Sequence, residues 1–261
     1  MIVIGERING MFKRVGQAIA SRDEATIIEV AQAQIEKGAN ILDLNVGPAA
    51  DDPVGTMQWL ATTVRKITDL PLSIDSPKPD AIRAGLEIAG NNSLINSTTG
   101  EQEKLAALMP LAAEYGCPII GLTIDENGVP RDAPGRTEVA LKIVASAMEH
   151  GVPPENVWID PVILPIAYTQ NHQPEVLKAI AECKLLSDPP PKTVLGLSNV
   201  SQGTRYRSLV NRTYLVMAIA YGLDAAIMDP LDDELMDAMI TAELLMNKTV
   251  YCDDFLKAYR T

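Results

Sequence analysis

The sequence predicts a (β/α)8 barrel, the TIM barrel, with residues 1–261 forming one domain. About eight short apolar runs recur along the chain, and a longer segment with helical spacing follows each of them. The length of 261 residues is close to the ~250 residues typical of such barrels. No long Pro-, Ser- or Gly-rich linker divides the chain, so a single domain is the simplest interpretation.

The predicted strands are runs rich in Ile, Leu and Val that end in small, polar or acidic residues. They cover residues 2–8, 40–46, 70–75, 93–97, 118–124, 157–162, 193–199 and 225–229. The alternation of such runs with helical segments is typical of parallel strands joined by helices. The glycines near the first run lack the GxGxxG spacing of a dinucleotide-binding turn, which disfavours a doubly wound open sheet.

The predicted helices lie between these runs. The first follows Ser21, carries Asp23 and Glu24 in its first turn and stops at Gly38. Further helical segments cover roughly residues 54–67, 80–89, 101–115, 136–150, 174–187, 204–222 and 232–247. The breaker-rich segment 187–192 falls where a helix should give way to a strand, so we interpret it as a loop.

The acidic composition disfavours one large class of function. The chain has 22 Lys and Arg against 34 Asp and Glu, a net charge of −12, which makes nucleic-acid phosphates poor partners. Hydrophobic residues make up 47% of the chain and can fill a sizeable core, but no apolar run approaches the ~20 residues of a membrane helix. Glu6 and Arg7 interrupt the first apolar run, so we expect no signal peptide and a cytoplasmic location.

The few histidines and cysteines argue against a metal site built by this chain alone. The two histidines and three cysteines lie far apart and form no CxxC, HxxxH or HExxH motif. We therefore expect no metal to be bound by the chain. An odd number of scattered cysteines also indicates a reducing compartment rather than a disulfide scaffold.

Polar residues close the predicted strands, at the end where a barrel enzyme has its active site. These strand ends carry Glu6, Arg7, Asn9, Asp43, Asn45, Asp75, Asn96, Asp125, Asp160, Ser198, Asn199, Gln202 and Asp229. The set holds no His or Cys, so it does not resemble a nucleophile–base pair and indicates recognition by hydrogen bonding. Carboxylates accept from adjacent N–H groups and carboxamides both donate and accept, so a planar heterocycle such as a pterin or purine fits.

Two other substrate classes fit less well. Glycoside hydrolysis also uses paired carboxylates, but it usually brings aromatic platforms, and only 4% of this chain is aromatic. Phosphate substrates favour a glycine-rich helix start with Arg or Lys, and no such segment stands out after the later strands.

Seven short motifs together resemble a known family. They are IGERING (residues 4–10), LDLNVG (42–47), IDS (74–76), INST (95–98), GLT (121–123), IDP (159–161) and LGLSNVS (195–201). In this combination the chain resembles the pterin-binding methyltransferases over essentially its whole length. The pattern is most similar to the methyltetrahydrofolate:corrinoid/iron–sulfur protein methyltransferases, and more distantly similar to the folate domain of methionine synthase and to dihydropteroate synthase.

The resemblance implies a role for each of several residues. It assigns Asp75, Asn96 and Asp160 to the pterin ring and places Asn199, as the catalytic residue, close to the methyl-bearing nitrogen N5. Three residues of the same loop would contact the pterin or an incoming corrinoid: Ser198, Gln202 and Arg207. Asp43 and Asn45 would support the site.

The resemblance also implies a reaction and a partner. The reaction moves a methyl group between N5 of 5-methyltetrahydrofolate and the cobalt of a corrinoid, in the acetyl-CoA pathway or in O-demethylation. Tetrahydrofolate leaves readily only if N5 gains positive character, which Asn199 would support by accepting a hydrogen bond that strengthens as N5 is protonated. The DxHxxG signature of a cobalamin domain is absent, so a separate corrinoid protein is the expected partner, and a homodimer the expected assembly.

Structural roles stay open for several of these residues. A strand-end Asp or Asn can instead cap the helix that follows it. Glu6 and Arg7 are adjacent on one strand and should point to opposite faces, so we expect one of them in a buried pair in the barrel floor. Asp125 precedes Glu126-Asn127-Gly128, a sequence that predicts a turn.

Two rival functions also stay open. A condensing enzyme similar to dihydropteroate synthase would need a Lys and Arg cluster for pyrophosphate. Lys192 precedes its strand, and no predicted strand end carries a lysine, which disfavours this rival. A folate-binding protein without catalysis would bind the pterin but would transfer no methyl group to any corrinoid.

Overall fold

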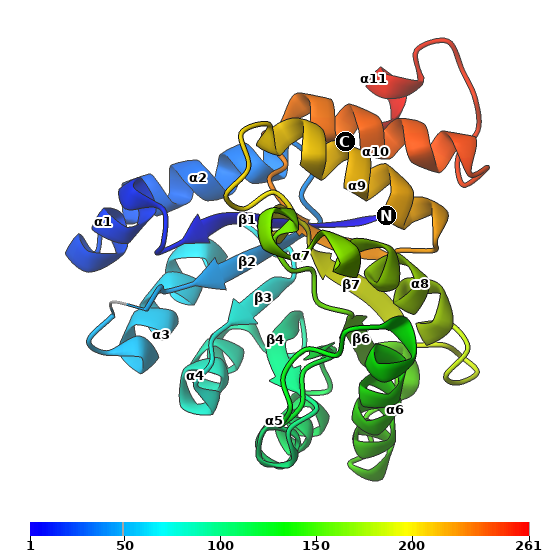
Figure 1. Cartoon of the computed structure of the whole chain (residues 1–261). Coiled ribbons are helices and arrows are strands. Elements are labelled where there is room, and N and C mark those ends of the chain that lie inside the picture. Colours follow the sequence, from blue (N-terminus) through cyan, green and yellow to red (C-terminus); the bar gives the residue numbers. More distant parts are fainter. Residues whose placement is uncertain (49, 261) are drawn as a thin grey trace.

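The eight predicted strands form one closed parallel barrel in sequence order, which confirms the predicted TIM-barrel fold (Figure 1). The computed structural model describes residues 1–48 and 50–260. The strands are β1 (Ile2–Asn9), β2 (Ile41–Asn45), β3 (Leu72–Asp75), β4 (Ser93–Thr99), β5 (Ile119–Leu122), β6 (Val157–Asp160), β7 (Lys192–Gly196) and β8 (Ala225–Met228). Neighbours pair in parallel all the way round, and β8 closes on β1 through Ile2–Ala225 to Gly5–Met228. That residues 1–261 form one domain stays a prediction.

Helices surround the barrel on its outer side (Figure 1). They are α1 (Lys13–Ser21), α2 (Glu24–Glu36), α3 (Pro53–Arg65), α4 (Pro79–Ala89), α5 (Gln102–Tyr115), α6 (Ala133–Glu149), α7 (Ile166–Thr169), α8 (Gln173–Cys183), α9 (Arg207–Ala220), α10 (Asp233–Leu245) and α11 (Phe255–Tyr259), with the 3-10 turns η1 (Pro154–Asn156), η2 (Gln170–His172) and η3 (Leu197–Asn199). The sequence pattern missed α1, α7 and α11. Within the described residues, no helix is long and apolar enough to cross a membrane.

Aspartates begin several of the outer helices. Asp23, Asp52, Asp132 and Asp232 each precede a helix and accept a hydrogen bond from a backbone N–H in its first turn. Each cap satisfies an N–H group that has no partner within the helix. These carboxylates are therefore used locally, unlike those at the strand ends.

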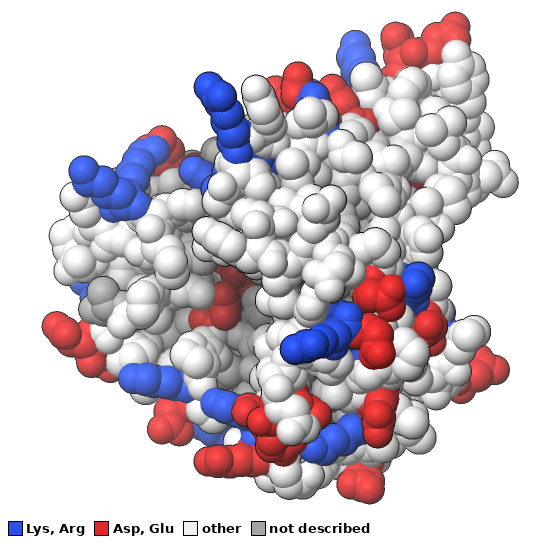
Figure 2. All heavy atoms as spheres, in the orientation of Figure 1, with Lys and Arg blue, Asp and Glu red and all other residues white. Residues whose placement is uncertain are grey.

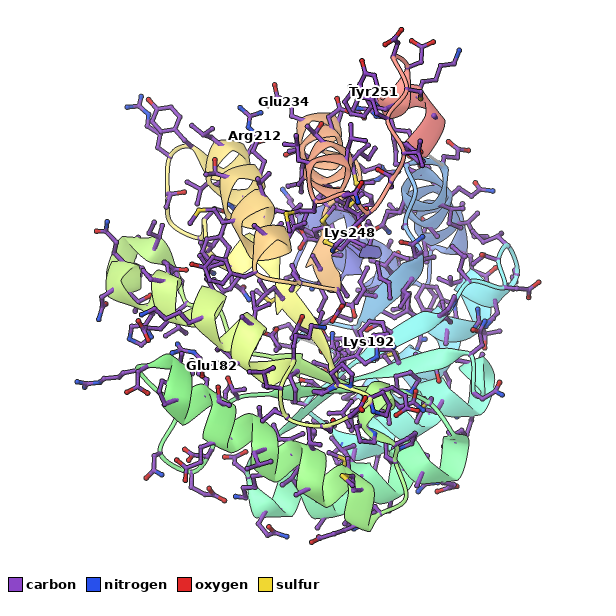
Figure 3. The ribbon with its side chains drawn as sticks, turned by 90° about the vertical axis from the view of Figure 1, so that its right-hand side faces the viewer. Glu182, Lys192, Arg212, Glu234, Lys248 and Tyr251 are labelled. Atoms are coloured by element: carbon purple, nitrogen blue, oxygen red, sulfur yellow. The ribbon has the colours of Figure 1, made fainter. Side chains whose placement is uncertain are left out.

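The barrel interior is apolar in its lower layers. The inward side chains there form one cluster: Ile4, Ile41, Leu94, Ile120, Trp158, Val194 and Ala225. Lys192, labelled in Figure 3, lies at the end where the strands begin, with its Nζ 5.6 Å from the centre of the Trp158 ring. The packed interior closes this end, so the opposite end is the one open to a ligand.

One strand boundary differs from the prediction in a way that matters for function. The run 193–199 was predicted as strand throughout, but β7 ends at Gly196 and residues 197–199 form the turn η3. The turn closes with a hydrogen bond from the Val200 N–H to the Leu197 carbonyl of 3.1 Å. Ser and Asn favour such turns, because their side chains compete with strand hydrogen bonding.

Candidate active site

The inward-facing positions change from apolar to polar along the strands. Side chains two residues apart share a face of a strand, so Glu6 follows Ile4 into the barrel, and Asp43 and Asn45 follow Ile41. In the same way Asp75, Asn96 and Asp160 follow Ser73, Leu94 and Trp158 on their strands. Figure 2 shows the surface hollowed at this end, with acidic atoms at the bottom of the hollow. We call this polar layer the mouth.

On the β2–β4 side, buried carboxylates and carboxamides are bonded in pairs. Asp43 is only 2% exposed, and its Oδ1 accepts from Ser73 Oγ at 2.5 Å and from Asn96 Nδ2 at 3.0 Å. Asn45 donates from Nδ2 to Asp75 Oδ2 at 2.6 Å and accepts from the Gly47 N–H at 2.7 Å. Asp43 and Asn45 thus hold Asn96 and Asp75 in place.

These bonds orient the groups that face a ligand. Because Asn96 directs its Nδ2 at Asp43, its carbonyl oxygen points away from Asp43 as an acceptor. The Asn45 bond uses one oxygen of Asp75, and the other oxygen can accept from a second donor. This side of the mouth presents acceptors and suits a ligand edge rich in N–H groups.

On the β6–β7 side, Asp160 is held by backbone groups. Its side chain is buried, and its two oxygens accept from the Val162 N–H at 2.7 Å and the Gly196 N–H at 3.2 Å. Val162 has a φ of +62°, which a β-branched residue rarely adopts. Backbone strain of this kind persists only where the surroundings impose it, and here it accompanies the bond that fixes Asp160.

Burial raises the pKa of each mouth carboxyl. The pKa of Asp160 is raised to about 6 by burial, against the lowering effect of the Val162 and Gly196 N–H groups. Burial likewise raises the pKa of Asp75 to about 6 and that of Asp43 well above its ordinary value, and the charge of Asp75 adds to the effect on Asp43. The pKa of Glu6 is raised to about 7, mainly by burial. Hydrogen-bond donors of a ligand would stabilise these carboxylates in the charged form.

The turn η3 carries Asn199 to the edge of the same mouth. A Cβ on Gly196 would lie 2.9 Å from Asn199 Nδ2 and 4.0 Å from Asp160 Oδ2. The Asn199 amide therefore lies against Gly196 and beside Asp160. It occupies space that a side chain at position 196 would fill. Asn199 itself is exposed, so its amide can meet a ligand.

The segment around Asn199 carries the other residues predicted to contact a ligand. Ser198 Oγ donates to Glu6 Oε1 at 2.7 Å, and Arg207 Nη2 donates to the Ser198 carbonyl at 3.3 Å. Arg207 Nε also bonds Ser201 Oγ at 3.1 Å. Gln202 is exposed on this loop. The structure thus links Ser198 to the mouth through Glu6 and Arg207 to Ser198, while Gln202 is exposed on the same segment, as Asn199 and Arg207 are.

The expectation for Glu6 and Arg7 was wrong. Neither residue forms a pair in the barrel floor: Glu6 bonds Ser198 at the mouth, and Arg7 Nη1 lies 3.4 Å from Asp229 Oδ2, with about a third of each side chain exposed. Glu6 does face the barrel, as alternation from Ile4 predicts, but it lies at the mouth, where its partner is a serine and not a charged side chain. The predicted turn at Asp125 is confirmed, since the Asp125 and Gly128 backbones bond each other in both directions.

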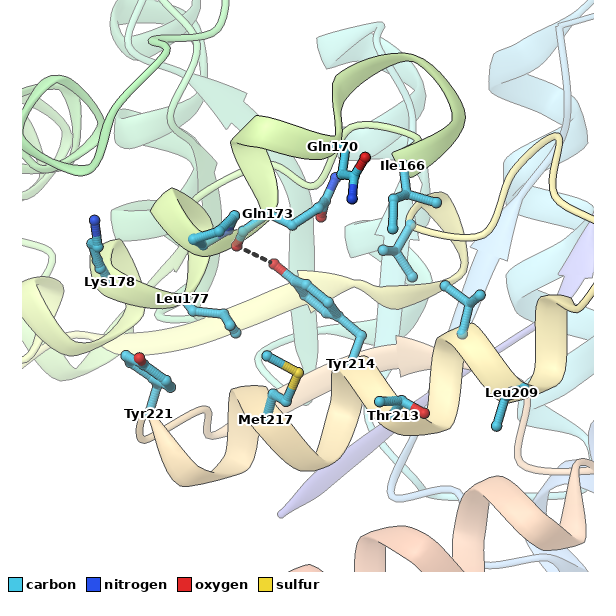
Figure 4. A pocket seen from close by; sticks show the side chains of 13 residues that line it. Ile166, Gln170, Gln173, Leu177, Lys178, Leu209, Thr213, Tyr214, Met217 and Tyr221 are labelled. Atoms are coloured by element: carbon cyan, nitrogen blue, oxygen red, sulfur yellow. Dashed lines mark hydrogen bonds between the residues drawn. The ribbon is translucent and has the colours of Figure 1, made fainter.

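A second hollow lies outside the barrel, between α8 and α9 (Figure 4). Its volume is about 480 Å³, and Leu177, Tyr214 and Met217 line it. The Tyr214 hydroxyl donates to the Gln173 carbonyl at 2.9 Å. None of the predicted site residues lines this groove, so it is separate from the mouth.

A parallel barrel with hydrogen-bonding carboxylates and carboxamides at its mouth defines a class of enzymes that recognise a planar heterocycle. The chain belongs to the pterin-binding enzyme family, whose model ("Pterin binding enzyme") matches residues 10–229. This confirms the resemblance found in the sequence.

Two curated relatives place the chain within this family. It is 32% identical to the methylcorrinoid:tetrahydrofolate methyltransferase of Eubacterium limosum over 100% of this chain and 96% of that protein. It is 33% identical to the methionine synthase of Mycobacterium tuberculosis over 87% of this chain, which is only 20% of that longer protein. These relatives confirm the prediction that the chain is an enzyme related to methyltransferases.

Solved structures agree in fold. The dihydropteroate synthase of Yersinia pestis with a pterine–sulfa conjugate has a TM-score of 0.70 at 17% identity, covering 95% of this chain and 94% of that one. The 7,8-dihydropteroate synthase of Vibrio fischeri has a TM-score of 0.71 at 13% identity, covering 95% of this chain and 94% of that one. At these identities the likeness concerns the barrel alone.

Proposed function

We propose that the chain moves a methyl group between N5 of 5-methyltetrahydrofolate and the cobalt of a corrinoid carried by a separate protein. The observation that carries this proposal is the meeting of Asp75, Asn96 and Asp160 with Asn199 at one mouth. The full-length similarity to a methylcorrinoid:tetrahydrofolate methyltransferase supports it. The name of that relative favours transfer from the methylcorrinoid to tetrahydrofolate.

The mouth would bind the pterin through its N–H groups. A pterin ring carries amide and amidine N–H groups along one edge, and Asp75, Asn96 and Asp160 present oxygen acceptors from three strands. Asp75 and Asp160, whose pKa values are raised to about 6, are largely ionised at neutral pH and would make charge-assisted bonds. Such bonds contribute roughly 1.5–3 kcal/mol each.

Asn199 would act at the reacting nitrogen. When the methyl group leaves, its bond to N5 breaks and the electron pair stays on N5, which takes up a proton. A carboxamide oxygen that accepts from the N5 proton stabilises the charge as it develops, without itself titrating. The place of Asn199 beside Asp160, at the rim rather than in the floor, supports this role because the methyl acceptor must approach from outside.

The corrinoid would arrive on a partner protein and supply Co(I) as the nucleophile, or methylcobalt as the donor. No metal-holding cluster of three or more His, Cys, Asp or Glu side chains is found in the described part of the chain. The partner would place its cobalt over the mouth, because the methyl group must pass between N5 and the cobalt. The cytoplasmic location, the homodimer and the pathway remain predictions. Sedimentation in solution would measure whether the protein is a homodimer.

The structure offers one observation against the condensing-enzyme rival. Lys192 lies at the start of β7, over Trp158, at the opposite end of the barrel from the mouth. It cannot bind a pyrophosphate at the mouth from there, and the solved dihydropteroate synthases share only the fold at this identity.

The proposal is tested by mixing the purified protein with 5-methyltetrahydrofolate and Co(I) cobalamin and recording the cobalt absorbance bands. We expect methylcobalamin to form, and the reverse reaction with methylcobalamin and tetrahydrofolate to yield 5-methyltetrahydrofolate. If the protein binds the folate but transfers no methyl group, the assay is repeated with a corrinoid protein as the acceptor. Absence of transfer in that assay as well would favour the non-catalytic folate-binding protein. Condensation of a pterin pyrophosphate with 4-aminobenzoate would favour the other rival.

A further inference from the structure

The first strand contains a bulge at two charged residues, Glu6 and Arg7. Gly5 pairs with Leu42, and Ile8 pairs with Leu44. Between these two pairs β1 advances by three residues and β2 by two. The extra residue leaves the Arg7 N–H without a strand partner, and Gln34 Oε1 accepts from it at 2.9 Å. A Cβ at Gly5 would displace Gln34 Oε1 from this position, so glycine leaves room for the bond to Arg7. Bulges of this kind commonly direct side chains near active sites.

Glu6 lies within the bulge and reaches past the neighbouring strand β8 to the turn that carries Asn199. Glu6 Oε1 accepts from Ser198 Oγ at 2.7 Å, a contact between residues 192 positions apart. Ser198 is the residue before Asn199 in η3, and its carbonyl accepts from Arg207 Nη2 at 3.3 Å. The turn is therefore held from β1 on one side and from α9 on the other.

We infer that Glu6 is a positioning residue for methyl transfer, which fixes η3 through Ser198 and so holds the Asn199 amide at the pterin. This inference rests on the proposed function. The carboxyl acts through the turn and not on the pterin itself, so it should affect transfer more than folate binding. A misplacement of about 1 Å at a reacting group is enough to slow a reaction by roughly 10²-fold.

Charged groups from four elements face Glu6. Arg7 lies on β1, Arg207 on α9, Asp43 on β2 and Asp229 after β8. Burial and the Asp229 charge raise the pKa of Glu6 to about 7, and the Ser198 bond and the two arginines act in the opposite direction. An ionised Glu6 accepts a stronger bond from Ser198 than a neutral one does. The turn should thus be held more firmly above pH 7 than below it.

The decisive experiment compares Glu6→Gln with the wild-type protein at pH 6 and pH 8. Glutamine keeps an acceptor for Ser198 but cannot ionise. In single-turnover transfer from 5-methyltetrahydrofolate to Co(I) cobalamin, we expect rates within about twofold of each other at pH 6 and a variant about tenfold slower at pH 8. The calorimetric Kd for the folate should change by less than about threefold at both pH values. A rate ratio that is the same at both pH values would overturn the inference.

A second test asks whether Glu6 acts through Ser198. Glu6→Ala and Ser198→Ala should each slow transfer, and the double variant should be no slower than the worse single variant, because both remove the same contact. Multiplying losses would show that the two residues act independently, and would also overturn the inference. Glu114→Gln serves as the matched control, since Glu114 is exposed and pairs with Arg83 on the outer helices.

Loss of the proposed function and loss of the Glu6 role give different results. If the wild-type protein neither binds the folate nor transfers its methyl group, the proposed function fails. If the wild type transfers the methyl group and only the pH-dependent difference of Glu6→Gln is missing, the role of Glu6 alone fails.

Discussion

Asp160→Asn should make the protein more stable at pH 8, although it removes a residue that we assign to the ligand. Burial raises the pKa of Asp160 from its ordinary 3.8 to about 6. The folded chain therefore holds this proton more tightly than the unfolded chain does. The stability that the neutral carboxyl contributes is fully present below about pH 4 and is lost as the pH rises to about 6. That loss is ~3 kcal/mol at pH 8.

Asparagine removes the buried charge and loses less stability than the charge costs. It keeps an oxygen for the Val162 N–H, but its NH2 group replaces the oxygen that accepts from the Gly196 N–H at 3.2 Å. Losing that bond costs about 1 kcal/mol, so the variant should be about 2 kcal/mol more stable than the wild type at pH 8. At pH 5 the advantage should shrink by ~1.4 kcal/mol, because the wild-type carboxyl is then mostly neutral.

Urea unfolding followed by circular dichroism at pH 5 and pH 8 measures this difference. The slope with urea should be the same for both proteins, so that a shift in midpoint reports stability. Glu36→Gln, at an exposed position of α2, is the control and should shift the midpoint little at either pH. A variant no more stable than the wild type at pH 8, or a difference that does not change with pH, would refute the reasoning.

Three further substitutions test the mouth. Asn199→Ala should slow methyl transfer far more than it weakens folate binding, because its bond matters most as charge develops on N5; equal losses in kinetics and calorimetry would remove its role. Gly196→Ala places a Cβ 2.9 Å from Asn199 Nδ2 and should displace that amide. Methyl transfer should then be slower, while the urea midpoint changes little. Unchanged kinetics would count against the position assigned to Asn199. Asp75→Ala should weaken folate binding by several-fold to a few hundred-fold, the loss of a bond worth roughly 1.5–3 kcal/mol, and a wild-type Kd would argue against its assignment.

Local sequence was sufficient to place the polar residues at the strand ends. Asp75, Asn96 and Asp160 follow short apolar runs, and the two-residue period of a strand carries the inward face from the apolar layer to the mouth. The same reasoning found Asp43 and Asn45. Their roles as bonding partners of Asn96 and Asp75 depend on cross-strand pairing, which the family resemblance suggested only as general support.

The features that were missed depend on contacts between distant residues. The β1 bulge involves Gln34, 27 positions from Arg7, and the bond of Glu6 to Ser198 joins residues 192 positions apart, so the pattern of the strand alone could not give the partners of Glu6 and Arg7. The end of β7 at Gly196 was missed because the apolar run continues to Leu197. Short helices such as α7, with four residues, hold too few turns to show a helical period.

The central claim is that the mouth binds the pterin of a folate through Asp75 and Asp160. It is tested most directly by calorimetric titration of tetrahydrofolate into the wild-type protein and into the double variant Asp75→Ala/Asp160→Asn, with thermal unfolding as the check that both are folded. We predict one folate bound per wild-type chain and a large loss of affinity in a folded double variant. Equal affinity in the two proteins, or no binding to the wild type, would contradict the claim.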